Sequence, residues 1–201
     1  MKTFCRGGVL VCLCLLSTPA LAMDRGCQPL MQSQITMTRT PVHIFMTETR
    51  TWSKNLSGAA AGMGLGGTKT SEEISTGKAV YVLNRGKWID MGASFAGIME
   101  HGDPNDPDVK KMREANRCKA LPDETVAGQP AVVYQEHNLE LGIDTKIWIS
   151  KSTHLPLKSE ITNKAAGSAL TSVTVSTYDY DNVRAPTGAI SMKQMMNARR
   201  H

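Results

Sequence analysis

The chain has 201 residues, of which 41% are hydrophobic and 20% are charged, and its formal net charge at pH 7 is +5. This length suffices for one domain with a buried core. The charge is mild, its basic residues are interspersed with acidic ones, and no basic strand is studded with aromatic residues, which argues against a nucleic-acid partner. A weak attraction to anionic membrane surfaces or acidic substrates stays open.

The first 22 residues have the pattern of a secretory signal. Lys2 and Arg6 make a basic start, residues 9–16 form a short apolar run, and Ala20-Leu21-Ala22 is a small-x-small exit. The apolar run is too short to anchor the chain in a bilayer. We expect cleavage after Ala22, which leaves a soluble periplasmic chain of 179 residues with a net charge of about +3.

Only two cysteines, Cys27 and Cys118, remain after the signal is removed. In an oxidising compartment two cysteines most simply form one disulfide. The closed loop of roughly 90 residues would contribute on the order of 4 kcal/mol to stability. No CxxC motif and no neighbouring histidine supports a metal or redox site, so we expect a structural bridge and neither a metal nor a cofactor.

The first part of the mature chain predicts a short helix followed by antiparallel strands. A brief helix in Cys27–Thr40 ends before Pro41, which cannot continue it. Val42–Trp52 alternates in strand fashion, and Ser71–Met91 reads as further strands. Between them, Gly58–Gly67 has GxGxxG spacing, but without a βαβ context it is interpreted as a loop and not as a nucleotide site.

The segment Asp103–Leu121 changes from a period of two to a period of three. Asp106 is a good N-cap, and apolar residues recur from Val109 to Cys118, so the segment predicts the best helix of the chain. The polar residues at its start lack the glycine and the terminal glutamate of a calcium loop and are interpreted as capping residues: His101, Asp103, Asn105, Asp106 and Asp108.

Strands return in the rest of the chain. Val126 is predicted to begin one, Ile143–Ile161 is a hairpin, and Leu170–Tyr180 is a long strand. We expect residues 23–186 to form one α+β domain, with an antiparallel sheet of about eight or nine strands packed on one or two helices. Residues 187–201 are predicted to be a basic amphipathic tail.

Catalysis finds little support in the sequence. There is no GxSxG and no HExxH, and His43, His137 and His154 are scattered over strands and a turn. We therefore expect a protein that is not an enzyme.

Binding fits the predicted sheet better. So large a sheet has more apolar surface than one helix can cover, which leaves a concave face for a hydrophobic ligand. Taken one at a time, most of the candidate residues for that face fit an ordinary hydrophobic core equally well. The candidate ligand-binding residues are Ile44, Met46, Tyr81, Leu83, Met91, Val133, Ile147, Ile149, Leu157 and Val175.

Three segments together resemble the periplasmic lipoprotein-carrier (LolA-like) superfamily, which includes outer-membrane lipoprotein-sorting proteins. They are the hairpin Trp148–Lys158 with its Leu155-Pro156 turn, the hairpin Tyr81–Trp88, and the closing segment Tyr178–Pro186. The resemblance implies a curved antiparallel half-barrel that wraps around helices and holds acyl chains on an apolar concave face.

The main hypothesis is thus a periplasmic protein that binds a lipid, a lipoprotein or another hydrophobic ligand without chemistry, with peripheral membrane contact left open. The alternative is a module for envelope protein–protein interaction or stress sensing, in which the loop Gly58–Gly67 discriminates the two. A third and weaker hypothesis is copper handling by Met192, Met195, Met196 and the scattered histidines.

Overall fold

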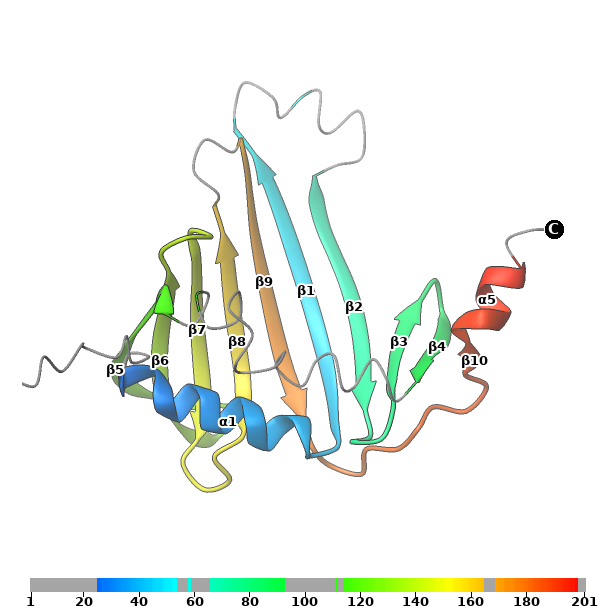
Figure 1. Ribbon diagram of the computed structural model, residues 1–201, viewed down its shortest axis with the longest axis horizontal. Coiled ribbons are helices and arrows are strands. Elements are labelled where there is room, and N and C mark those ends of the chain that lie inside the picture. Colours follow the sequence, from blue (N-terminus) through cyan, green and yellow to red (C-terminus); the bar gives the residue numbers. More distant parts are fainter. Residues whose placement is uncertain are drawn as a thin grey trace, which may run out of the picture.

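The computed structural model describes residues 25–53, 58, 66–92, 111, 114–164 and 169–198, and within them it contains one ten-stranded sheet (Figure 1). The elements in chain order are η1 (Arg25–Cys27), α1 (Gln28–Thr38), β1 (Val42–Trp52), β2 (Gly67–Ser75), β3 (Val80–Asn84), β4 (Lys87–Gly92), β5 (Asn116–Val126), β6 (Gln129–Asn138), β7 (Ile143–Ser150), β8 (Pro156–Asn163), β9 (Leu170–Asp179), β10 (Ile190–Ser191) and α5 (Met192–Ala198).

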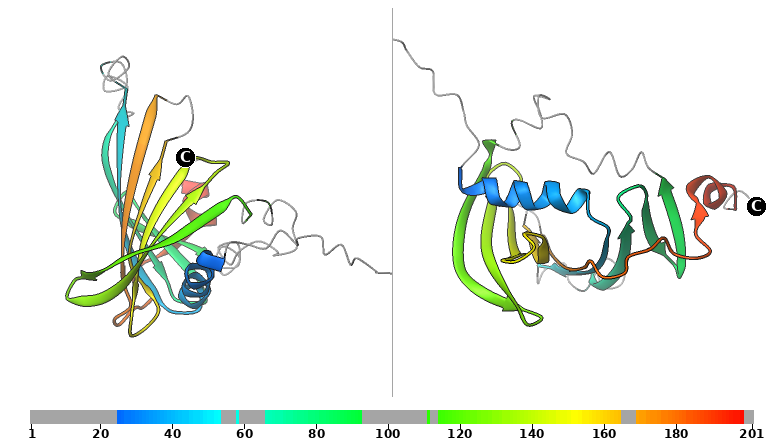
Figure 2. Two further views of the ribbon diagram at one scale, coloured as in Figure 1. Left: turned by 90° about the vertical axis from the view of Figure 1, so that its left-hand side faces the viewer. Right: turned by 90° about the horizontal axis from the view of Figure 1, so that it is seen from below.

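The sheet is open and almost entirely antiparallel. Its strand order is β10-β4-β3-β2-β1-β9-β8-β7-β6-β5, and only the short pair of β10 with β4 is parallel. Seen from below in Figure 2, the sheet bends into an arc and α1 lies across the inside of that arc. We call the side that carries α1 the concave face and the opposite side the convex face. The predicted curved sheet packed on helices is confirmed, with ten strands in place of eight or nine.

The helix α1 follows from local sequence. Pro29 sits in its first turn, where a missing N–H costs nothing, and Pro41 stops the chain from continuing as a helix. Leu30 and Ser33 are buried one turn apart, so this side of α1 faces the sheet. Leu30 packs against Ile147 and Ile149 of β7.

The strands show the period-two pattern expected of them. On β1, Ile44 and Met46 lie on one face, while His43 and Phe45 lie on the other. Phe45 is 41% exposed on the convex face, where its ring lies 4.0 Å from that of His43. The predicted hairpin of Ile143–Ile161 is confirmed as β7 and β8.

A second buried cluster lies on the convex face. It consists of Ala131, Val133, Trp148 and Leu157, with Leu121 and Val126 of β5 packed against it. A bulge between Leu121 and Glu124 interrupts the pairing of β5 with β6, and bulges increase the bend and twist of a strand. Both faces of the sheet therefore contribute to the core.

Trp148 is the polar anchor of this convex cluster. Its indole N–H donates a hydrogen bond of 2.7 Å to Oε2 of Glu124, and the Nζ atoms of Lys146 and Lys158 each lie 4.5 Å from a ring centroid of the indole. Hydrogen bonds from Lys146 first, and then from Trp148, lower the pKa of the Glu124 carboxyl group. The arrangement holds β5 to β7 across β6.

The helix predicted for Asp103–Leu121 is wrong at its end. Lys111 and Glu114 are helical, and the N–H of Ala115 donates to the carbonyl oxygen of Lys111 at 3.1 Å, but residues 116–121 belong to β5. Antiparallel pairing with β6 along one side of that stretch, together with the packing of Leu121 on the convex cluster, outweighs a helical pattern. Residues 103–110, 112 and 113 lie outside the described residues.

The prediction that Val126 begins a strand is also wrong, because β5 ends there. Ala127 and Gly128 follow with φ angles of 49° and 80°, the conformation of a tight hairpin turn.

Other predictions fall wholly or mostly outside the described residues: the secretory signal, the polar cluster from His101 to Asp108, most of Gly58–Gly67, and Arg199 and Arg200 of the tail. Ile190 and Ser191 of that tail pair with Ile89 and Asp90 of β4.

The predicted disulfide is confirmed. Cys27 and Cys118 are bonded, with their Cα atoms 5.1 Å apart and a sequence separation of 91. The bond ties η1, at the start of α1, to the edge strand β5. It thus holds the N-terminal end of α1 against one end of the arc.

We expect reduction of the disulfide to lower the free energy of unfolding by about 4 kcal/mol, because the unfolded chain regains the entropy of a long loop. Urea unfolding with and without reductant measures this loss, and non-reducing mass spectrometry should find no free thiol. The variant with both Cys27→Ser and Cys118→Ser should show the lower stability and no response to reductant. Equal stability of the oxidised and reduced chains would contradict a stabilising role.

Replacing Trp148 by alanine should lower the free energy of unfolding by about 3–5 kcal/mol, because loss of the buried indole leaves a cavity and Glu124 loses one of its two side-chain donors. Chemical denaturation measures the effect. Phe45→Ala is the control, since an exposed ring on the same face should cost less than about 1 kcal/mol. Similar losses in the two variants would mean that the convex cluster is not a core.

Candidate ligand-binding face

The structure brings together only part of the predicted ligand-binding set. Ile147 and Ile149 lie on the concave face under Leu30, and Ile44 lies there beside the end of α1 with Met46 two residues further along β1. These four predicted residues lie on the same face of the sheet, which is the face that carries α1.

Five of the predicted residues lie on the convex face. Val133 and Leu157 pack around Trp148. Tyr81 is paired with Ile74, which is paired with His43, and this register places it on the convex side. Leu83 follows two residues after Tyr81, and Val175 is paired with Thr47 on the same side. Met91 is the extra residue of a bulge opposite Val80 and Tyr81, where strict alternation does not hold.

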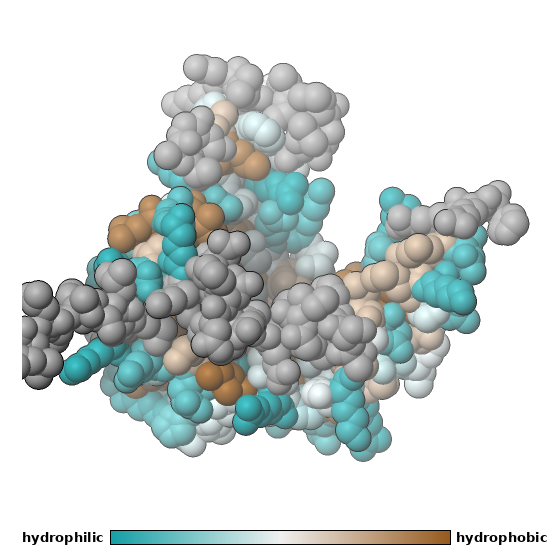
Figure 3. All heavy atoms as spheres, viewed as in Figure 1, coloured by the Kyte–Doolittle hydropathy of each residue, from teal (hydrophilic) through white to brown (hydrophobic). Residues whose placement is uncertain are grey.

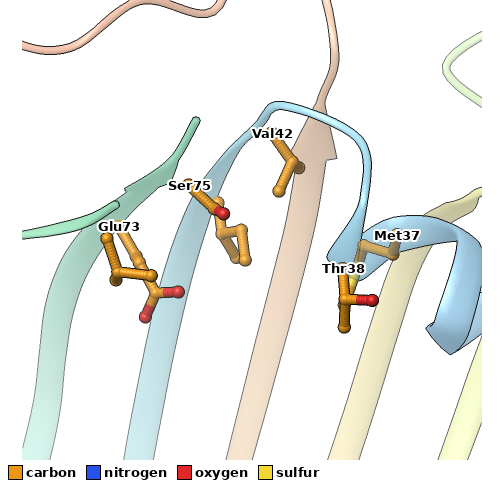
Figure 4. A pocket seen from close by; sticks show the side chains of 7 residues that line it. Met37, Thr38, Val42, Glu73 and Ser75 are labelled. Carbon is orange, nitrogen blue, oxygen red and sulfur yellow. The ribbon is translucent and has the colours of Figure 1, made fainter. Parts of the chain in front are cut away.

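A pocket opens on the concave face where α1 ends over the first three strands (Figure 4). In Figure 4, Glu73 and Ser75 enter from β2 on one side, and Met37 and Thr38 at the end of α1 lie on the other side. The cavity volume is about 90 Å³. It is lined by Met37, Thr38, Val42, Ile44, Glu73, Ser75 and Val80.

This pocket arises from a chain reversal. The helix ends at Thr38, a short link passes Pro41, and β1 begins at Val42, so the end of α1 returns over the start of the sheet. Small-molecule sites typically enclose about 300–1,000 Å³, so the pocket has room for one end of an acyl-sized ligand and not for all of it.

Glu73 is the ionisable residue of the pocket. It is half-buried, and its carboxylate makes no hydrogen bond or ion pair with any residue that the structure describes. Burial raises the pKa of the Glu73 carboxyl group. Its neighbour Glu72 faces the convex side and lies 3.2 Å from Nε2 of His43. Adjacent glutamates thus occupy opposite environments, one paired and one not.

A strip of hydroxyl groups continues from Glu73 across the concave face. Ile44 is paired with Glu73 on one side and with Tyr178 on the other, and the hydroxyl of Tyr178 lies 2.9 Å from that of Ser159. Burial is the main cause of a raised pKa at Tyr178, and the Glu73 carboxylate adds to it. Glu73 on β2 therefore interacts electrostatically with Tyr178 on β9, across β1.

A further buried hydroxyl lies on the helix side. Ser33, one turn before Met37 on α1, is 3% exposed, and its Oγ has no hydrogen-bond partner among the described residues. Buried hydroxyl groups are nearly always hydrogen-bonded, so a buried Ser33 hydroxyl without a partner is unusual.

The convex face carries a second depression with a different character. Its lining is polar and its volume is about 310 Å³. His137 lies there with its Nδ1 2.9 Å from Oδ1 of Asp144. The lining residues are Arg117, Cys118, Lys119, Gln135, His137 and Asp144, which do not suit an apolar ligand.

The histidines do not converge. His43 pairs with Glu72, His137 pairs with Asp144, and His154 is exposed in the turn between β7 and β8 with a φ of 58°. In the part of the chain that the structure describes, no group of three or more His, Cys, Asp or Glu side chains is arranged to hold a metal ion. Within the same ranges, no helix has the length and apolarity needed to cross a membrane.

Exposed apolar residues occur at the end of the sheet away from α1. Leu139 and Leu141, in the turn from β6 to β7, are 57% and 48% exposed, and Figure 3 shows hydrophobic surface at this end of the sheet (upper left). Ile161, near the end of β8 and paired with Thr145, is 36% exposed. None of these three exposed residues is among the predicted ligand-binding residues.

The pocket contains several residues that the sequence analysis missed, namely Met37, Thr38, Val42, Glu73, Ser75 and Val80. The strand pattern of Ser71–Met91 carried a signal, because alternation places Glu73 and Ser75 on one face and Ile74 on the other. The strand pattern alone does not show which face α1 covers, and so it does not place Glu73 and Ser75 in a pocket.

Fold and site together define an open half-barrel whose concave face is covered in part by one helix. No protein-family model and no curated protein matches the chain. Among solved structures, LprF from Mycobacterium bovis matches 82% of this chain and 97% of its own, at 13% identity and a TM-score of 0.40. MucB in complex with MucA(peri) matches 81% of this chain at 17% identity and a TM-score of 0.41, and this chain spans 60% of that MucB chain.

The neighbours also include the LolA superfamily protein NE2245 from Nitrosomonas europaea, which matches 77% of this chain and 91% of its own, at 9% identity and a TM-score of 0.28. This neighbour carries the name of the superfamily that the three sequence segments resemble. At these TM-scores the likeness carries no functional argument, and function must be argued from this chain's own residues.

Replacing Glu73 by glutamine should raise the melting temperature at pH 7.5. Because burial raises its pKa, folded Glu73 holds its proton at pH values where the unfolded chain has lost it, so stability falls as the pH rises above the ordinary value of 4.5. The gain of Glu73→Gln should therefore vanish as the pH is lowered below 4.5. Thermal unfolding of both proteins from pH 4 to 8 measures it, and a variant less stable at pH 7.5 would refute an unpaired carboxylate.

Proposed function

We propose that this chain is a periplasmic binding protein whose concave face takes up an acyl chain or another hydrophobic ligand without changing it chemically. The observation that carries the proposal is the pocket at the end of α1, whose walls are mainly the apolar side chains of Met37, Val42, Ile44 and Val80. Burial of apolar ligand surface is the driving force, at about 25 cal/mol per Å² removed from water.

The rest of the concave face supports a ligand longer than the pocket. Met46 follows Ile44 on β1 and is only half-buried. Ile161 on β8 extends the apolar surface towards the far end of the strands. A lipid would place one end in the pocket and lie along these residues.

The position of α1 suggests how the site admits its ligand. The disulfide and Leu30 hold the N-terminal half of α1, whereas Met37 and Thr38 at its C-terminal end form a wall of the pocket. We propose that the C-terminal end of α1 shifts outward to admit the ligand while the N-terminal half stays attached.

Two adjacent residues of β1 offer a matched test, because Ile44 faces the pocket and Phe45 faces the opposite side. The measurement is titration with the neutral fluorescent probe N-phenyl-1-naphthylamine. The variant Ile44→Asp should weaken binding at least tenfold, which corresponds to about 1.4 kcal/mol, and Phe45→Asp should leave it unchanged. Circular dichroism confirms folding of both, and Ile44→Ser serves as a milder substitution.

The unmodified protein must itself take up the probe, and lipid extraction of protein purified from periplasm should yield acyl compounds. An unmodified chain that binds no probe and carries no lipid would refute the proposal. Equal losses in Ile44→Asp and Phe45→Asp would place binding elsewhere.

A second candidate function is interaction with an envelope protein, and a group of aromatic side chains on the convex face favours it. The rings of His43 and Phe45 lie 4.0 Å apart, and that of Trp88 lies 6.1 Å from His43. Exposed aromatic residues are enriched at protein interfaces. The same two variants separate the functions: loss of a cross-linked partner in Phe45→Asp, with probe binding intact, would favour the interaction module.

A further inference from the structure

Seven residues line the pocket at the end of α1, and Glu73 is the one among them with an ionisable side chain. Its neighbours in the lining are apolar except for the hydroxyl groups of Thr38 and Ser75. A purely apolar ligand would leave this carboxylate without a partner in the closed site, which costs free energy. The ligand of the pocket must therefore be considered together with the charge of Glu73.

Other glutamates on the same two strands have partners. Oε1 of Glu48 on β1 lies 2.8 Å from Nε of Arg50, and Oε2 of Glu72 on β2 lies 3.2 Å from Nε2 of His43. Glu73 has neither an ion pair nor a hydrogen bond with the described residues. Its environment already raises the pKa of its carboxyl group, so the charged form gains from any cation that enters.

The position of the helix end also favours a positive charge in the pocket. The C-terminal end of a helix carries a partial negative charge, and Met37 and Thr38 at that end of α1 form a wall of the pocket. Arg39, the next residue, is exposed and is not part of the lining.

We propose that this pocket recognises the protonated amine of an amphiphilic ligand, with Glu73 as its counter-ion and Met37, Val42, Ile44 and Val80 around the first methylenes of its chain. The inference rests on the proposed function of the concave face and specifies its ligand class. The rest of the alkyl chain lies along Met46 towards Ile161. Ser75 and Thr38 can accept hydrogen bonds from the ammonium group, which has three N–H donors.

The test compares three ligands of one chain length, namely dodecylamine, dodecanol and dodecanoic acid, each used below its micelle concentration at pH 7.5. Each competes with bound N-phenyl-1-naphthylamine on the full mature chain. We expect dodecylamine to bind at least tenfold more tightly than dodecanol, and dodecanoic acid to bind most weakly. In Glu73→Gln the amine and the alcohol should bind equally.

Glu136 provides the matched control. It lies on β6, burial raises the pKa of its carboxyl group as well, and it is not part of the pocket lining. The variant Glu136→Gln should therefore keep the preference for the amine. Glu73→Ala is a second variant that should also abolish the preference.

The outcomes separate this inference from the proposed function. If all three ligands displace the probe equally from the unmodified chain, the inference is overturned and hydrophobic binding stands. If none displaces it and the chain binds no probe, both are overturned. A preference for dodecylamine that persists in Glu73→Gln, or disappears equally in Glu136→Gln, would also overturn the role of Glu73.

Discussion

The attachment of α1 to one face of an open sheet is the interaction on which the rest of this structure depends. The disulfide from Cys27 to Cys118 fixes the start of the helix, and Leu30 seals against Ile147 and Ile149 one turn later. Without this cover, Ile147 and Ile149 would lose their packing partner Leu30 on the concave face. With α1 in place, the concave face carries a helix and the convex face does not, so side chains on the two faces lie in different environments.

The two halves of α1 have different consequences. Under the N-terminal half the concave face is closed, and Ile147 and Ile149 are buried as ordinary core. Under the C-terminal half the packing is incomplete, and the gap beside Met37 forms the pocket that contains Glu73. Successive turns of one helix thus cover a packed core and the proposed binding pocket, and a polar group without a partner is a candidate marker of a functional site.

The sheet is stabilised from its convex side as well. Trp148, packed with Val133 and held by Glu124, forms a core that does not involve α1. This cluster shares no residue with the pocket, so the packing of Trp148 does not depend on the C-terminal end of α1.

Period-two alternation located most strands, since it is a local property that any half-buried strand must show: Val42–Trp52 and Ile143–Ile161 are examples. The same local reasoning failed at Asp103–Leu121, where the apolar spacing up to Cys118 imitates a helix. Pairing with a strand later in the chain decides the conformation of residues 116–121, and no local pattern contains that information.

The sequence by itself determined most of the strands, the short first helix and the disulfide partners, because alternation, proline positions and a count of two cysteines are all local or compositional. Only the tertiary structure decided which face is concave. Alternation separates Ile44 from Phe45 but does not say which of them α1 will cover, and for that reason Val133 and Leu157 were grouped with Ile147. Glu73 became a site residue only when strand register and the end of α1 brought it beside Ile44.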